Sequence, residues 1–252
     1  MSAYAPFAPY YDGLMRKAGY SQRADYLCSL LAHFEHAPGL TLDLACGTGS
    51  MTVELAKRGF DIYGTDADAA MLSEAMQKAD EAGLSILFLC QKMQQLDLYG
   101  TVDTVICTLD GLNHLSGERD LRKTFERVSL FLNPGGYFLF DMNTVHKYRD
   151  LMGDTTIAEN REEGSFIWDN SFDEEEGLNY YELAVFLPRE DGLYEKCEEV
   201  HCQKAYPQEE IESLIKEAGM DLLAVYDAYT MEPATKDSER MFFVAREKGK
   251  NK

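Results

Sequence analysis

The chain of 252 residues is long enough to bury a full hydrophobic core, and we expect one α/β domain with a smaller inserted piece. Its formal net charge of -20 at pH 7 argues against nucleic acid as a partner, because no local basic stripe offsets the repulsion. No apolar run approaches the roughly 20 residues of a membrane-spanning helix, the first residues lack the layout of a signal peptide, and the six scattered cysteines suit reduced thiols. We therefore expect a cytoplasmic protein without membrane contact, either a monomer or a homodimer.

Residues 1–36 combine an aromatic-rich loop, which includes Tyr11, with an amphipathic helix at about residues 21 to 34. Residues 37–150 then alternate short apolar runs with helical patterns. The predicted strands are 40–45, 60–66, 84–90, 102–110 and 135–143, and the predicted helices lie within 50–59, 68–83 and 118–136. Strands that are separated by helices in this way predict a parallel, doubly wound sheet with ligands at the carboxyl ends of its strands.

The pattern changes in residues 151–206. Strand-like segments at 164–172, 178–188 and 193–206 are separated by acidic turns that contain glycine, which is typical of an antiparallel meander. Residues 207–252 return to a helix and two strands. We predict an α/β fold with a mostly parallel, seven-stranded sheet and a small antiparallel β insertion that covers the substrate.

The stretch TLDLACGTGS, residues 41–50, ends the first strand on a corner that contains Gly47 and Gly49. Glycine lets the backbone turn tightly and approach a ligand, and the following helix offers unpaired N–H groups. The dinucleotide fingerprint requires a third small residue at the start of the helix, where this chain has Thr52. The corner therefore predicts a bound ligand without the dinucleotide signature.

Asp66 ends the second strand, about twenty residues further on. A carboxylate at this point can accept hydrogen bonds from both hydroxyls of a ribose, which indicates a nucleoside ligand. The alternative is that Asp66 only caps the next helix, although Asp68 is better placed as the cap.

Five stretches in order resemble the successive motifs of class I S-adenosylmethionine-dependent methyltransferases: LDLACGTGS, YGTDADAAML, QKMQQLDL, VDTVICTLDGLNHL and LNPGGYFLFDMN. The resemblance covers nearly the whole chain. The head YAPFAPYYDGLM and the insertion after the fifth strand are similar to the branch that contains the amino-sugar N,N-dimethyltransferases of macrolide biosynthesis and many uncharacterised bacterial relatives. The resemblance implies the Rossmann-like methyltransferase fold and S-adenosyl-L-methionine as the cofactor.

The resemblance also implies the residues that bind the cofactor. They are Ala45, Cys46, Gly47 and Gly49 for the methionine half, Asp66 for the ribose diol, Ala67, Met71 and Met93 for adenine, and Leu109 with Tyr11 around the sulfonium. Family members commonly carry Asp-Met where this chain has Lys92-Met93, and a lysine cannot accept a hydrogen bond from the adenine amino group. We expect Met93 to hold adenine, with Gln91 or Gln94 as substitutes for the missing carboxylate.

Tyr11, Asp110 and His114 are the candidate catalytic bases, because the loop after the fourth strand lies at the strand ends beside the cofactor. The amino-sugar enzymes carry a histidine and a tyrosine at the positions of His114 and Tyr11, so we favour this pair. Alignment and desolvation supply most of the rate of methyl transfer. The alternative is therefore that Tyr11 only shapes the pocket and His114 only caps a helix that starts near Ser116.

The segment that enters the insertion and the insertion itself supply the predicted substrate contacts, since such additions select substrates in this fold class. These contacts are His146, Tyr148, Trp168 and His201. For His201 the alternative is a half-buried strand position without a role. Cys197 and Cys202 flank His201, but no second ligand pair at finger spacing accompanies them, so we expect no metal.

The preferred function is methyl transfer to a small-molecule acceptor, by preference at nitrogen, because an acidic protein with aromatic side chains around its pocket suits a cationic acceptor. A cofactor-binding protein without transferase activity, which acts as a sensor or interaction module, is the second hypothesis, and Lys92 favours it. An RNA or protein methyltransferase is the third, and the negative charge argues against RNA.

Overall fold

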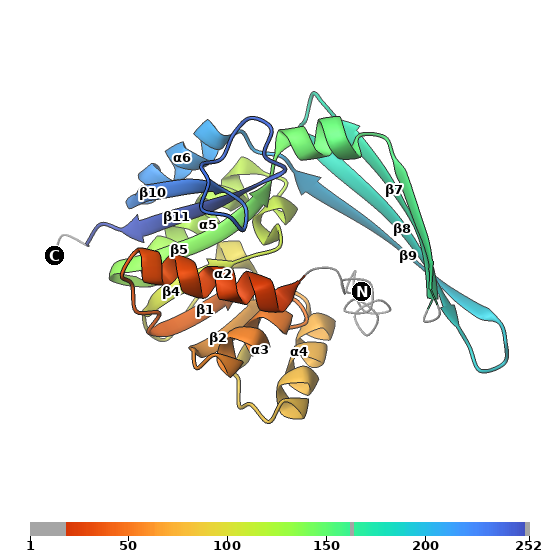
Figure 1. The fold of residues 1–252 in the computed structure, drawn as a ribbon, viewed down its shortest axis with the longest axis horizontal. Helices are drawn as coiled ribbons and strands as arrows, with labels where there is room; N and C mark the ends of the chain where they lie inside the picture. Colours follow the sequence, from red (N-terminus) through yellow and green to blue (C-terminus); the bar gives the residue numbers. More distant parts are fainter. Residues whose placement is uncertain (1–18, 162–163, 250–252) are drawn as a thin grey trace.

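A computed structural model describes residues 19–161 and 164–249 (Figure 1). Within these residues, the central sheet consists of β1 (Leu40–Leu44), β2 (Asp61–Asp66), β3 (Phe88–Cys90), β4 (Val102–Cys107), β5 (Leu132–Asn143), β10 (Met220–Asp227) and β11 (Arg240–Glu247). The order across the sheet is β10-β11-β5-β4-β1-β2-β3, and β11 runs antiparallel to both of its neighbours while the other pairs are parallel. The predicted seven-stranded, mostly parallel sheet is confirmed.

Helices cover both faces of this sheet (Figure 1). The helices α5 (Glu118–Phe131) and α6 (Gln208–Glu217) pack on one face, and α2 (Tyr20–His33) and α3 (Ser50–Lys57) pack on the other, with α4 (Ala69–Glu81) beside α3. The period of two along β5 explains the two layers. Phe138 and Phe140 belong to the core under α5, and Leu139 between them belongs to the core under α2.

The fifth strand begins earlier than the sequence predicts. Leu132 pairs with Val102 and Tyr137 pairs with Thr104, so residues 133–136 bulge out opposite the single residue Asp103 of β4. The Asn-Pro-Gly-Gly segment between the predicted helix and strand is therefore a bulge inside β5.

A separate antiparallel sheet follows β5, in the order β6-β7-β8-β9. Its strands are β6 (Thr156–Arg161), β7 (Gly164–Asp173), β8 (Leu178–Pro188) and β9 (Tyr194–Lys204). The predicted β insertion is confirmed, but β6 was not predicted, because the sequence TIAENR is polar and mostly exposed at the edge of the sheet. Figure 1 shows this insertion sheet extending away from the core, beyond the short π-helical segment η4 (Lys147–Met152).

The root of the insertion is anchored by an aromatic cluster. Tyr148 of η4 is fully buried and packs with Tyr181 of β8 and Ala205. The Trp168 ring of β7 meets the Tyr181 ring edge-on, with 4.9 Å between the centroids. Aromatic pairs of this kind stabilise packing beyond their buried area, so the base of the insertion sheet is held firmly against the carboxyl ends of the core strands.

Across residues 19–161 and 164–249, no helix has both the length and the apolar character that crossing a bilayer requires.

Candidate functional site

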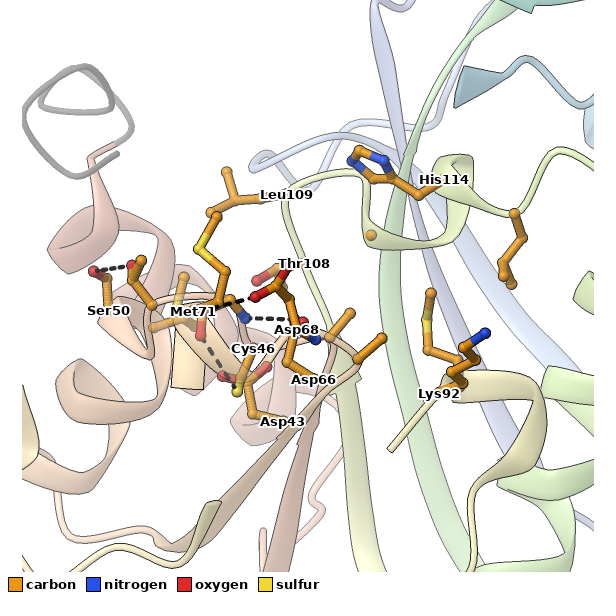
Figure 2. Close-up of a pocket in the computed structure, with 18 of the residues that line it drawn as sticks. Asp43, Cys46, Ser50, Asp66, Asp68, Met71, Lys92, Thr108, Leu109 and His114 are labelled. Atoms are coloured by element: carbon orange, nitrogen blue, oxygen red, sulfur yellow. Dashed lines mark hydrogen bonds between the residues drawn. The ribbon is translucent and has the colours of Figure 1, made fainter. Parts of the chain in front are cut away.

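A cavity of about 400 Å³ lies at the carboxyl ends of β1, β2 and β4 (Figure 2). Ligands of doubly wound sheets bind at this edge, and the volume is that of a small-molecule site. Eight of the ten residues predicted around the cofactor line it: Ala45, Cys46, Gly47, Asp66, Ala67, Met71, Met93 and Leu109. The fold therefore brings these residues together around one space.

The corner after β1 is shaped by backbone geometry. Ala45 and Gly47 adopt left-handed conformations, with φ of 59° and 54°, and a Cβ on Gly47 would meet no atom within 4 Å. Gly49, which was also predicted to bind the cofactor, does not line the cavity. A Cβ there would lie 2.8 Å from the Ala75 Cβ, so this glycine serves the close packing of α3 against α4.

Asp66 is fixed by two backbone groups. Its Oδ2 accepts a hydrogen bond from the Gly47 N–H at 2.9 Å, and its Oδ1 accepts one from the Asp68 N–H at 2.9 Å. Asp68 caps α4 through the N–H groups of Ala70 and Met71, so the alternative that Asp66 is the cap is wrong. Burial raises the pKa of Asp66, and the two N–H bonds oppose that rise. Each oxygen keeps a further lone pair with which to accept a ligand hydroxyl.

Asp43 is a lining residue that the sequence did not single out. It lies in the buried strand β1, and its Oδ2 accepts a hydrogen bond of 2.6 Å from the Thr52 hydroxyl. Burial raises the pKa of Asp43 to about 7, although the Thr52 bond opposes the rise. The available signal was a single acid in an otherwise apolar strand, which needs a reason to be buried.

Lys92, Met93 and Gln94 line the opposite end of the cavity. Of the two predicted substitutes for the usual carboxylate, Gln94 is therefore in place. Gln91 is not, because both ends of its amide bond the backbone of Asp97, at 3.0 and 2.9 Å. Gln94 Nε2 donates to Asp120 Oδ2 at 3.4 Å, so the Gln94 amide oxygen is the acceptor that this residue can offer to adenine.

The loop after β4 is held in an unusual conformation. Leu109 and Asp110 have φ of 61° and 58°, and their backbone N–H groups donate to the two oxygens of the buried Asp141, at 3.0 and 2.7 Å. Left-handed conformations at non-glycine residues are strained and gather at functional sites. The Asp141 carboxylate thus fixes the loop that carries Leu109 to the cavity wall.

Asp110 itself does not line the cavity, and its carboxylate is already engaged. Its Oδ1 accepts from Arg240 Nη2 at 2.6 Å, and Arg240 Nη1 bonds Asp141 at 2.6 Å. Burial alone would raise the pKa of Asp110, but the positive charge of Arg240 leaves it lowered. A carboxylate in this ion pair is a poor proton acceptor, which weakens the prediction that Asp110 is a base. Arg240 and Asp141 were missed because they lie far from Asp110 in the sequence.

His114 does line the cavity, at the end of the short helix η3 (Gly111–His114). It does not cap α5, which begins at Glu118 after Gly117 and has no side-chain cap bond. In Figure 2 its ring lies on the same side of the cavity as Leu109. Its Nε2 lies 2.8 Å from Nε2 of Gln203, a residue of β9 that the sequence did not indicate.

The four predicted substrate contacts lie in different surroundings, and none of them lines the cavity. Tyr148 is fully buried at the root of the insertion. His146 bonds Asp150 at 2.8 Å on the outer side of η4. Trp168 and His201 belong to β7 and β9, and the His201 ring lies 6.2 Å from the His114 ring, edge to face. His201 is thus the predicted contact that lies against a residue of the cavity wall.

Tyr11 lies outside the described residues. Within the described ranges, there is no group of three or more His, Cys, Asp and Glu side chains that could hold a metal ion.

Comparison with known proteins agrees with this geometry. A family model described as "Methyltransferase domain" matches residues 41–136, which include the corner, Asp66 and the β4 loop. Over 244 residues, the chain is 34% identical to "Putative methyltransferase YqeM" of Bacillus subtilis (strain 168), with 96% of both chains covered.

Solved structures resemble the whole chain. An S-adenosylmethionine-dependent methyltransferase from Clostridium acetobutylicum ATCC 824 matches with a TM-score of 0.88 and 30% identity, over 98% of this chain and 99% of that one. CalS10, an amino pentose methyltransferase from Micromonospora echinaspora, shares the fold, with a TM-score of 0.74 and 20% identity over 94% of this chain and 95% of that one. The chain belongs to the class I S-adenosylmethionine-dependent methyltransferases, the family whose cofactor is S-adenosyl-L-methionine.

Proposed function

We propose that the protein transfers the methyl group of S-adenosylmethionine to a small-molecule acceptor, at nitrogen. The observation that carries this proposal is the composition of the cavity lining. A carboxylate held by backbone N–H groups, Asp66, lies at the end of β2, and a polar ring, His114, lies at the end of η3. The first suits a ribose diol and the second suits a reacting partner beside it.

The residues present fit the cofactor. Asp66 keeps free lone pairs for two hydroxyls, and the bare backbone of Gly47 leaves room for the amino-acid portion. Ala45 and Cys46 would lie beside that portion, and Ala67, Met71 and Met93 would contact adenine, with Leu109 near the sulfonium. When bound, the cofactor supplies a methyl carbon on a positively charged sulfur.

The acceptor side of the proposal rests on the inner face of the insertion sheet. Glu199 of β9 is buried, its Oε2 bonds His201 Nε2 at 2.8 Å, and its Oε1 has no hydrogen-bond partner among the described residues. The indole N–H of Trp168 is likewise buried and has no hydrogen-bond partner among the residues that the structure describes. These two polar atoms are closed to solvent, but the His201 and Trp168 side chains that carry or flank them are half-buried and keep accessible surface for an acceptor. His201 and Trp168 are therefore proposed substrate contacts.

The chain contributes mainly position and exclusion of water. The strained Leu109–Asp110 loop and the insertion sheet bracket the space next to the cofactor, which favours alignment of acceptor and methyl carbon and removes competing water. Tyr11 stays a predicted member of this wall. His146 and Tyr148 are better explained by the η4 surface and the aromatic anchor than by contact with an acceptor.

The test is a pair of measurements on the intact protein. Isothermal titration should show binding of S-adenosylmethionine and of S-adenosylhomocysteine, and a mass-spectrometric assay over a panel of amines, phenols, transfer RNA and peptides should show methylation of a small amine. Absence of binding would refute the cofactor site. Binding without turnover across the panel would support the sensor hypothesis, and methylated RNA or peptide would refute the small-molecule acceptor.

A further inference from the structure

Gln203 connects the insertion sheet to the wall of the cofactor cavity. Its Oε1 accepts hydrogen bonds from the hydroxyl groups of Tyr148 and Tyr181. Its Nε2 lies 2.7 Å from Asp110 Oδ2 and 2.8 Å from His114 Nε2. An amide has two N–H donors and a carbonyl oxygen with two lone pairs, so all four hydrogen-bonding positions of Gln203 are in use.

The orientation of this amide is dictated by Asp110. The Asp110 carboxylate is ionised beside Arg240, and an ionised carboxylate can only accept hydrogen bonds. The N–H side of Gln203 must therefore face Asp110, and the carbonyl side must face the tyrosines. The tyrosine side agrees, because Asn143 Nδ2 donates to the Tyr148 hydroxyl at 2.9 Å and leaves the Tyr148 proton for Gln203 Oε1.

This orientation determines the proton position on His114. One N–H of Gln203 points to Asp110 and the other points to His114 Nε2, so Nε2 accepts a hydrogen bond and carries no proton. A neutral imidazole then holds its proton on Nδ1. An imidazolium would oppose one N–H to another. Burial lowers the pKa of His114, and the opposing effect of Asp110 is smaller, which agrees with a neutral ring.

The Nδ1–H group is available to a ligand. Protein atoms surround most of the His114 ring, which accounts for the desolvation, but the side chain keeps an accessible edge on the cavity wall. No hydrogen bond of Nδ1 to the described parts of the chain occurs in the structure. In this tautomer Nδ1, the ring nitrogen that does not bond Gln203, is a hydrogen-bond donor. It cannot take a proton from an incoming nucleophile, because the lone pair that would accept it belongs to Nε2 and is bound to Gln203.

We propose that Gln203 holds His114 in the Nδ1–H tautomer, and that His114 donates a hydrogen bond to an oxygen of the methyl acceptor instead of acting as a base. The inference rests on the proposed function for the presence of an acceptor. The lone pair of the acceptor nitrogen is needed for the bond to the methyl carbon, so the His114 N–H must pair with another atom. The substrate class is then a small molecule with an unprotonated amino group and a hydroxyl, carbonyl or carboxylate oxygen close to the amine nitrogen. Gln203 is a positioning residue.

Histidine tautomers are read directly by NMR of protein labelled with ¹⁵N-histidine. The chain has five histidines, so His114 can be assigned by comparison with a His114→Asn sample. We expect the unprotonated nitrogen of His114 to be Nε2 in the wild-type protein. In Gln203→Glu a carboxyl oxygen takes the place of the amide nitrogen between Asp110 and His114. A proton that it holds is shared with the ionised Asp110, so this oxygen offers His114 Nε2 only a lone pair, and we expect the proton of His114 to appear on Nε2. A wild-type protein with Nε2 protonated, or a tautomer that Gln203→Glu leaves unchanged, would overturn the proposal.

The matched control is Asn170→Asp, which makes the same amide-to-acid change on the same sheet. Asn170 bonds Asn179 and Gly153 and does not bond His114, so the His114 tautomer should stay as in the wild type. A tautomer change in this control would mean that charge in the insertion, and not the Gln203 hydrogen bond, sets the proton position. If Gln203→Glu does not fold, the wild-type spectrum decides alone.

The outcome is independent of the proposed function. The tautomer is measured without cofactor or acceptor, so a protein that fails to bind S-adenosylmethionine still reports the role of Gln203. If the cofactor binds but His114 carries its proton on Nε2, the proposed function stands and the present inference fails.

Discussion

The cavity has two walls that are built in different ways. The β1–β2 wall is made by backbone geometry within a short stretch of chain, and its central contact joins Gly47 to Asp66, 19 residues apart. The β4 wall is made by side chains from distant segments, since Asp110 bonds Gln203 and Arg240, which are 93 and 130 residues away. A backbone-built wall is set by local sequence, whereas the β4 wall exists only once the insertion and the last strand have docked.

The first prediction removes the residue that joins the β4 wall to the core. Arg240→Met would leave the carboxylates of Asp110 and Asp141 without their shared cation. Because removing one partner of a buried ion pair strands the other charge, we expect the free energy of unfolding to fall by about 3–5 kcal/mol. Urea denaturation measures it. Arg246→Met, on the exposed side of the same strand, is the control and should change stability by less than about 0.5 kcal/mol. A loss of that small size for Arg240→Met would contradict the shared-cation role.

The second prediction tests the backbone-built wall. Asp66→Ala removes the acceptor of the Gly47 and Asp68 N–H groups and the proposed partner of the ribose. Hydrogen bonds to charged groups contribute about 1.5–3 kcal/mol, so we expect the Kd for S-adenosylmethionine to rise about 10- to 100-fold. Titration calorimetry measures it, and Asp61→Ala, at the exposed start of β2, should leave the Kd unchanged. An unchanged affinity in Asp66→Ala would place the ribose elsewhere.

The contrast between the walls also explains what the sequence could predict. The glycine corner and the strand-end Asp66 follow from local spacing, and the structure puts them where that spacing requires. The partners of Asp110 could not be inferred, because no periodicity relates β4 to β9 or β11. Asp110 therefore looked like a free acid, and Gln203 looked like an ordinary strand residue.

Gly49 shows a different limit. It belongs to the predicted motif, but the structure gives two reasons for glycine within the fold itself, a φ of 70° and a Cβ position that would lie 2.8 Å from Ala75 of α4. A sequence pattern reports that a side chain is forbidden at a position without reporting which neighbour forbids it. The same limit applies to β6, whose polar residues at an exposed edge carry no alternation to detect.

The third prediction uses the raised pKa of Asp43, about 7 in the folded chain. Between roughly pH 4 and pH 7 the folded protein holds this proton while the unfolded chain has lost it, so stability falls with rising pH, by about 1.4 kcal/mol per unit at most. Above the folded pKa the slope ends. Asp43→Asn keeps an acceptor for Thr52 and cannot ionise. Its free energy of unfolding, measured by urea denaturation at pH 5, 6, 7 and 8, should therefore rise relative to that of the wild type as the pH increases through this window. A constant difference would contradict it, and Asp61→Asn controls for the lost negative charge.

The last prediction separates the two roles of His114 by magnitude. A general base contributes about 100- to 10,000-fold to rate, whereas a neutral hydrogen bond contributes about 0.5–1.5 kcal/mol, or roughly 2- to 13-fold. With an amine that the protein methylates, we therefore expect His114→Ala to lower kcat/KM by less than about 15-fold, with cofactor affinity retained. His114→Asn places an amide N–H near the Nδ1 position and should recover most of that loss, although it cannot act as a base. A loss beyond about 100-fold in both variants would restore the role of His114 as a base. In that case the hydrogen bonds of the β4 wall would not determine what His114 does in the reaction.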